Sequence, residues 1–118
     1  MEPIYDRSGR HVGWMKDDSV RNAHGQVVAW VRGTHIFNAR GKTLGFLQSR
    51  FFRDLQGNAV AFLRGASGGP VPPVPAVAPV PPIPAIPPIP PIPPVPPVPP
   101  IMSLGWSSSS WSDFLGGH

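Results

Sequence analysis

The chain has 118 residues and two unlike parts: 18 of its 19 prolines lie between positions 70 and 100, and all ten Lys and Arg residues lie between positions 7 and 64. The first 64 residues carry five carboxylates and therefore a net charge of +5, which favours anionic partners such as phosphates, anionic lipid or nucleic acid. Without cysteine, a disulfide framework and a Cys-based metal site are excluded. The N-terminal residues lack a signal-peptide pattern, and no apolar run is long enough to cross a membrane, so we expect a cytoplasmic protein.

Residues 1–64 contain a sixteen-residue unit repeated four times without insertion. The unit reads apolar-x-Asp/Asn-x-x-Gly-x-x-apolar-Gly/Ala-Trp/Phe-apolar, and its copies begin at Ile4, Val20, Ile36 and Phe52. Asp or Asn followed three residues later by Gly is typical of a type I turn closed by a left-handed residue, the three-residue hairpin loop with a G1 bulge. The sequence therefore predicts four tandem β-hairpins.

This turn assignment also predicts a strand register. Asp6 should pair with Arg10 and Ile4 with Val12, an apolar cross-strand pair. The equivalent expected pairs are Val20 with Val28, Ile36 with Leu44, and Phe52 with Val60.

Because side chains alternate along a strand, the register also assigns faces. The aromatic column is expected on the same, core-facing side as these pairs; it comprises Trp14, Trp30, Phe46 and Phe62. The Gly/Ala column and the following apolar column should lie on the opposite face, as should the column of Tyr5, Arg21, Phe37 and Arg53. Four small residues at one place suggest close backbones around a symmetry axis, where four hairpins could bury faces that one alone could not.

The repeat unit resembles that of the bacterial four-fold β-flower domain family. The resemblance covers Ile4 to Gly65 and extends to a Gly-rich joint, a proline-rich tract and a tail like residues 111–114. It implies an all-β fold in which four hairpins surround a pseudo-four-fold axis, and it brings no established activity.

Residues 65–69 are predicted to form a flexible Gly-rich joint, and residues 70–101 a polyproline II rod. Val or Ile occupies every third position from Val71 to Ile101, and polyproline II has three residues per turn, so one side of the rod would be apolar. If straight, the rod would be about 95 Å long and would project far beyond the hairpins. It could act as a spacer, or its apolar side could pack on a partner or on a second rod.

Residues 102–118 form a Trp/Ser-rich tail. Ser110 followed by Asp113 is a weak helix start, and Gly116 is a stop signal, which together predict a single helical turn. We expect the apolar side chains of the tail to dock on the chain's own hairpins, on a second copy or on another protein. The expected docking residues are Trp106, Trp111, Phe114 and Leu115.

The leading functional hypothesis is a non-enzymatic binding or adaptor protein, in which a rigid head and a rod present the docking tail. In the alternative, the head binds an anionic ligand or a lipid surface through four cations, Arg10, Arg21, Lys42 and Arg53. An enzyme that uses the axis is a third hypothesis. Nucleic acid is disfavoured because stacking requires exposed rings, and the aromatic column is expected in the core.

No catalytic, cofactor or metal site is predicted. The histidine spacings match no zinc motif, and Asp17–Asp18 has no counterpart in the later repeats. The oligomeric state, the identity of the partner, and whether the axis is open or filled stay undetermined by the sequence.

Overall fold

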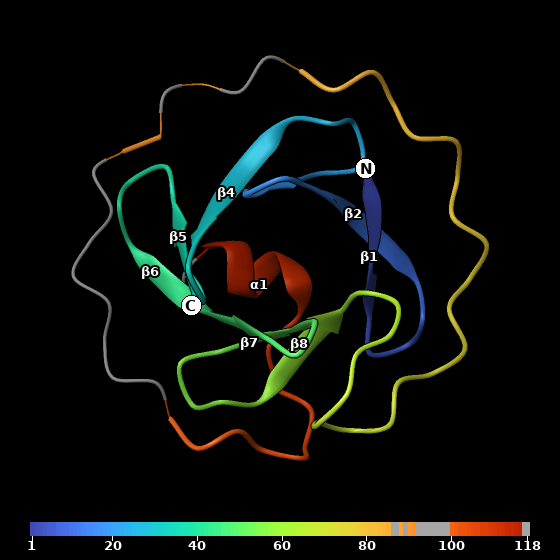
Figure 1. Cartoon of the computed structure of the whole chain (residues 1–118), viewed down its shortest axis with the longest axis vertical. Coiled ribbons are helices and arrows are strands. Elements are labelled where there is room, and N and C mark those ends of the chain that lie inside the picture. The colour runs from blue at the N-terminus through green and yellow to red at the C-terminus, as the bar shows by residue number, and fades with distance from the viewer. Residues whose placement is uncertain (86–87, 89, 92–99, 117–118) are drawn as a thin grey trace.

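The computed structural model describes residues 1–85, 88, 90–91 and 100–116, in which eight antiparallel strands close into one barrel. Each strand pairs with its neighbours in chain order and β8 returns to β1, which confirms the four-hairpin, all-β prediction (Figure 1). Hairpins 1 to 4 are formed in order by β1 (Glu2–Asp6) and β2 (His11–Lys16), β3 (Ser19–Arg21) and β4 (Val27–Arg32), β5 (His35–Asn38) and β6 (Thr43–Gln48), and β7 (Phe51–Arg53) and β8 (Ala59–Phe62). A short helix, α1 (Trp111–Gly116), follows near the C-terminus. No helix in the described ranges is long and apolar enough to cross a membrane.

The hairpin turns have the predicted geometry. In hairpin 1, the Asp6 N–H donates to the Arg10 carbonyl oxygen and the Gly9 N–H to the Asp6 carbonyl oxygen, both at 2.9 Å. The Asp6 carboxylate accepts the N–H groups of Ser8 and Arg10. Gly9 has a φ of +80°, a conformation that glycine adopts without steric cost. The same bonding recurs in the other three hairpins.

Beyond the turns, the predicted register is wrong by one residue. Tyr5 faces His11, but Ile4 faces Gly13 rather than Val12, because Val12 is an extra residue at a β-bulge. The same shift occurs in hairpins 2 to 4, where the observed pairs are Val20 with Ala29, Ile36 with Gly45, and Phe52 with Ala61. One extra residue reverses the face to which the following side chains point.

The interior of the barrel therefore keeps the first apolar column, as expected, but the Gly/Ala column and the apolar column after it take the place that was expected for the aromatic column. Ile4, Val20, Ile36 and Phe52 are completely buried and share one cluster with Val31 and Leu63, members of the apolar column that had been assigned to the other face. The small column also faces inward: Ala29 and Ala61 belong to this cluster, and a Cβ on Gly13 would lie 2.5 Å from the Arg21 carbonyl oxygen. Side chains fill the axis.

The aromatic column lies instead on the outer face of the barrel, together with the column of Tyr5 and Arg21. Phe62 packs against Tyr5 with ring centroids 5.6 Å apart, and Trp30 stacks on Phe37 at 6.2 Å. All of these residues are nevertheless buried, so another part of the chain must cover the outer face.

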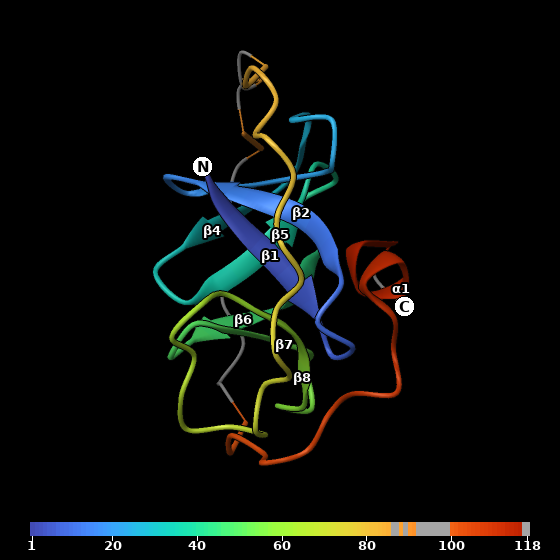
Figure 2. The same ribbon diagram turned by 90° about the vertical axis from the view of Figure 1, so that its right-hand side faces the viewer.

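That cover is the proline-rich segment, which does not project as a rod. Its described part, here called the belt (residues 70–85, 88, 90–91 and 100–103), runs around the outside of the hairpins (Figures 1 and 2). Ala76, Ala85 and Ser103 donate their N–H groups to the carbonyl oxygens of the turn glycines Gly9, Gly25 and Gly57, at 2.9, 3.4 and 3.2 Å. The prediction of a projecting rod is thus wrong for the described residues; Ile86, Ile89, Ile92, Val95 and Val98 of the apolar row lie outside them.

The belt and the barrel are matched in period. The three donors in the belt are nine and eighteen residues apart, whereas the glycines that accept from them are sixteen and thirty-two residues apart. Pro73, Pro82 and Pro100, which lie against the same glycines, repeat the spacing of nine and eighteen. Nine belt residues therefore accompany each sixteen-residue hairpin.

The contact between belt and turn predicts that replacing two glycines of left-handed conformation by alanine destabilises the protein to different extents. A Cβ on Gly9 would lie 2.6 Å from the Val74 carbonyl oxygen, whereas a Cβ on Gly33, at φ +62°, would meet nothing within 4 Å. Gly33→Ala should lower the free energy of unfolding by about 1 kcal/mol through backbone strain alone. Gly9→Ala should lower it by about 2–3 kcal/mol, because the belt must also shift. Urea unfolding of both variants measures this difference, and equal losses would contradict the contact.

Candidate functional site

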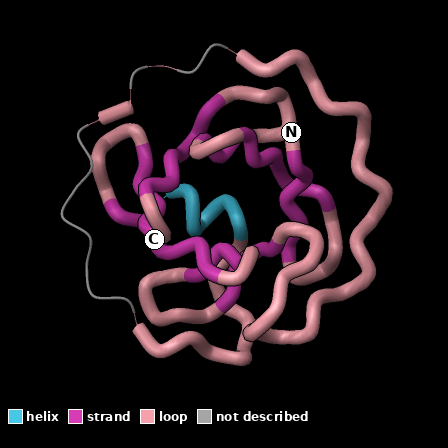
Figure 3. The backbone as a smooth tube through the Cα atoms, in the orientation of Figure 1, coloured by secondary structure: helices cyan, strands magenta, loops and turns pink. Residues whose placement is uncertain are grey.

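The helical turn of the tail forms as predicted and docks on the chain's own barrel. Ser110 begins it: its hydroxyl oxygen accepts the Asp113 N–H at 3.1 Å, and its carbonyl oxygen accepts the Phe114 N–H at 2.9 Å. Trp111 and Phe114 are buried and, with the partly buried Leu115, join the interior cluster of the barrel. α1 lies on the barrel axis at one end (Figures 2 and 3). Of the three docking targets expected, the structure shows the chain's own hairpins.

Trp106 docks separately, on the outer face of hairpin 4. Its ring centroid lies 6.1 Å from that of Phe51 and 6.3 Å from that of Phe62. Two main-chain hydrogen bonds fix the segment, since Ala59 donates to Gly105 at 3.1 Å and Ser107 donates to Ala59 at 2.7 Å. A partner that used the four predicted docking residues would have to displace them from the barrel.

The four cations of the alternative hypothesis do not share an exposed face. Arg10 and Lys42 are exposed beside hairpin turns, whereas Arg21 and Arg53 are buried under the belt. Arg21 Nη1 donates to the carbonyl oxygens of Gly25 and Ala85, both at 2.8 Å, and so ties a turn to the belt. Arg53 Nη1 makes the equivalent bonds at 2.7 Å. Burial lowers the pKa of Arg53, and the neighbouring Asp54 carboxylate opposes this shift.

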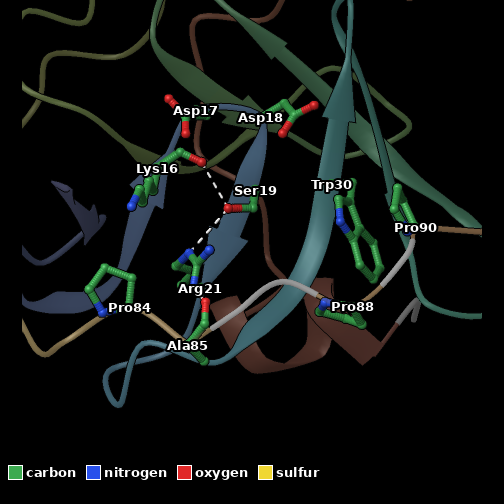
Figure 4. Close-up of a pocket in the computed structure, with 10 residues that line it drawn as sticks. All are labelled: Lys16, Asp17, Asp18, Ser19, Arg21, Trp30, Pro84, Ala85, Pro88 and Pro90. Atoms are coloured by element: carbon green, nitrogen blue, oxygen red, sulfur yellow. Dashed lines mark hydrogen bonds between the residues drawn. The ribbon is translucent and has the colours of Figure 1, made fainter.

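A cavity of about 710 Å³ lies between hairpin 2 and the belt. Arg21 and Trp30 line it from facing sides, and belt residues close a third side (Figure 4). The described residues that line it are Lys16, Asp17, Asp18, Ser19, Arg21, Trp30, Pro84, Ala85, Pro88 and Pro90.

The cavity offers hydrogen-bond donors. Arg21 uses Nε to donate to the Ser19 hydroxyl at 3.1 Å, and that hydroxyl donates to the Lys16 carbonyl oxygen at 2.8 Å. Within the described chain, no hydrogen bond engages Arg21 Nη2 or the Trp30 indole N–H, whose side chains are 2% and 5% exposed. Both nitrogens keep some accessible surface, whereas the fully buried nitrogens without a partner lie elsewhere: His11 Nε2, Trp14 Nε1, His35 Nδ1 and Arg53 Nε. Such a site can hold a ligand that presents oxygen acceptors, such as a carboxylate, a phosphate or a carbonyl group.

Sequence reasoning identified Arg21 as a site residue but missed Trp30, because the register error placed the aromatic column in the core. It also missed Ser19. A signal was present: position 19 holds the small Ser where the equivalent positions of hairpins 3 and 4 hold His35 and Phe51. Among the described residues, no group of three or more His, Asp or Glu side chains is placed to hold a metal ion.

The docking of α1 predicts a large contribution from one tail residue. Phe114 is 2% exposed, so Phe114→Ala should lower the free energy of unfolding by about 3 kcal/mol through lost burial and a residual cavity. Leu104→Ala, at a side chain that is 73% exposed in the same tail, should change it by less than about 0.5 kcal/mol. Chemical denaturation checks both values, and a Phe114→Ala variant as stable as Leu104→Ala would contradict the docking.

Comparison with known proteins supports the architecture and leaves the chemistry open. No curated protein and no solved structure matches the chain significantly. A family model described as 4-fold beta flower protein matches residues 2–115, which span the barrel, the belt and almost all of α1. The resemblance noted from the repeat unit is thereby confirmed, and the chain belongs to the four-fold β-flower family.

Proposed function

We propose that this protein is a non-enzymatic binding protein whose barrel holds a small anionic ligand in the cavity between hairpin 2 and the belt. The observation that carries the proposal is the buried Arg21, which lines the cavity and whose Nη2 has no hydrogen-bond partner in the described chain. An anionic oxygen is the acceptor to which a guanidinium N–H bonds most strongly. The Trp30 indole N–H offers a second donor across the same cavity (Figure 4).

The charges around the cavity disfavour a ligand with several negative charges. Lys16 and Arg21 are balanced by Asp17 and Asp18, so the charged side chains of the lining are neutral in sum. A polyanion such as a nucleic acid or a phosphoinositide headgroup would meet both carboxylates, whereas a single carboxylate can lie on Arg21 alone. The proline rings of the belt would contact the apolar part of such a ligand.

The side chains of the cavity support binding rather than catalysis. The Ser19 hydroxyl, the one hydroxyl in the described lining, donates its proton to a main-chain carbonyl oxygen and accepts from Arg21. It is therefore not activated by a base, as a nucleophilic serine would be.

Removing the indole donor should weaken binding of an anion. Trp30→Phe introduces the residue found in this column in hairpins 3 and 4, and the matched control Trp14→Phe makes the same change in hairpin 1. With acetate as the probe, Trp30→Phe should lower the affinity about tenfold, because a hydrogen bond to a charged group is lost. Trp14→Phe should leave it unchanged.

The measurement is a titration of the isotope-labelled full chain with acetate, followed by the amide resonances of residues 19–21. Equal affinities of the two variants, or acetate-induced shifts confined to other hairpins, would sink the proposal.

A second candidate function, self-association through the belt, is favoured by one observation. Six described residues of the apolar row point away from the barrel, each 90% exposed or more: Val71, Val74, Val77, Val80, Ile83 and Ile101. No charged residue lies between Arg64 and Asp113, so two copies would not repel one another along this row. The proposed partner is the same row of a second copy, since contiguous exposed apolar surface of this kind marks interaction sites.

Polar substitutions test this candidate directly. A variant with Val74, Val77 and Val80 replaced by Ser should raise the dissociation constant of the dimer by at least about tenfold, because apolar side chains leave the interface. Leu55→Ser, at a side chain 46% exposed outside the belt, is the control and should leave it unchanged. Sedimentation velocity over a series of concentrations measures the dissociation constant. A wild-type chain that stays monomeric throughout would rule the candidate out.

A further inference from the structure

Hairpins 2 and 4 provide two versions of the same site, thirty-two residues apart in the barrel. Arg21 and Arg53 are both buried, and each donates through Nη1 to the glycine of its own turn and to the belt. The residues at the preceding turns also match, because Asp17 and Ser49 have left-handed φ values of 53° and 50°. The two sites thus share one backbone and one buried cation.

Beside hairpin 4, the chain fills its own site. The Gly-rich joint, expected to be flexible, packs there: the Ser67 N–H donates to the Ser49 carbonyl oxygen at 3.1 Å, and Arg53 Nη2 donates to the Gly68 carbonyl oxygen at 3.2 Å. Gly69 follows in close contact, since a Cβ there would lie 2.6 Å from Arg53 Nη2 and 2.8 Å from the Phe51 ring. A main chain with small side chains is therefore what the hairpin 4 site accepts.

Beside hairpin 2, the corresponding space is the cavity. Asp17, the counterpart of Ser49, lines it, and Arg21 Nη2 lacks the acceptor that Gly68 provides to Arg53. Pro88 stands eighteen belt residues before Trp106, the ring that covers the hairpin 4 site. Ser19 in place of Phe51 leaves additional room, and Trp30 in place of Phe62 adds a donor.

From this internal comparison we propose that the ligand of the cavity is the C-terminal end of a peptide with small side chains, whose terminal carboxylate accepts from Arg21 and whose N–H donates to the Asp17 carbonyl oxygen. This inference rests on the proposed function and names the ligand class. The hairpin 4 site supplies the recognition of a main chain, and the guanidinium of Arg21 together with the extra indole donor favours a carboxylate over an uncharged amide. A cavity of about 710 Å³ lies within the usual range for such ligands.

The probe is acetyl-Ser-Gly with a free carboxylate, which copies residues 67–68 and places its carboxylate where Gly68 offers its carbonyl oxygen. Calorimetric titration of the full chain should show this peptide binding about tenfold more tightly than acetate, because main-chain hydrogen bonds are added to the carboxylate contact. The same peptide with a C-terminal amide should bind about tenfold more weakly than the free acid.

The variant Ser19→Phe places the side chain of hairpin 4 in the cavity and should abolish peptide binding. His35→Phe, which introduces the same residue at the equivalent position of hairpin 3, is the control and should retain peptide binding. If Ser19→Phe does not fold, chemical-shift mapping replaces it: the peptide should shift the Trp30 indole resonance of the wild-type chain and leave that of Trp14 in place.

The outcomes separate the two proposals. A peptide that binds no more tightly than acetate, or an amide that binds as tightly as the acid, overturns the peptide inference and leaves the anion site standing. If neither acetate nor the peptide perturbs hairpin 2, both proposals fail.

Discussion

The β-bulge in the second strand of each hairpin is the constraint on which the rest of the structure depends. An extra residue at Val12 and its equivalents places the small Gly/Ala column opposite the first apolar column, and both then face the axis. The Trp/Phe column consequently faces outward, where four large rings would stand exposed to water. A closed barrel with such an outer face is complete only when something covers it, and the belt, the joint and Trp106 are that cover.

The high proline content of the belt is explained by its position over the outer face of the barrel. The described belt meets the turns of hairpins 1, 2 and 4 without joining a sheet. Such a segment would leave main-chain N–H groups unpaired, and proline removes them. Proline also restricts the conformations of the unfolded chain, so less conformational entropy is lost when the belt packs on the barrel. Three of the N–H groups that remain in the described belt have a partner, because Ala76, Ala85 and Ser103 each meet a turn glycine. The described Val and Ile residues of the apolar row point away from the barrel, since the proline rings occupy the contact with the turns.

Features set by local chemistry could be predicted from the sequence, whereas those set by long-range register could not. The Asp/Asn and Gly columns determine the turns, the fourfold period implies closure, and Ser110 with Gly116 marks the helical turn. The bulge at Val12 has no signature of its own, since Val suits a regular strand equally well. It reversed the faces expected for the aromatic column, the Gly/Ala column and the apolar column that follows, whereas the first apolar column stayed in the core. For the belt, the three-residue period of polyproline II concealed the nine-residue period that matches the hairpins. Arg21 was identified by its charge, but its cavity depends on what the belt covers, and so on contacts between distant segments.

Within the fourfold barrel, one outward-facing position alternates between an aromatic residue and an arginine, and the cavity lies beside one of the arginines. Hairpins 1 and 3 place Tyr5 and Phe37 where hairpins 2 and 4 place Arg21 and Arg53, so the barrel buries two cations although an aromatic ring fits the same position. A buried charge destabilises the fold unless it has hydrogen-bonding or charged partners. Each of the two arginines donates through Nη1 to a turn glycine and to the belt. The chain has a single Gly-rich joint, which provides the acceptor for Arg53 Nη2. Arg21 lines a cavity instead and its Nη2 has no such acceptor in the described chain, so under the proposed function a ligand would take the place in hairpin 2 that the joint takes in hairpin 4.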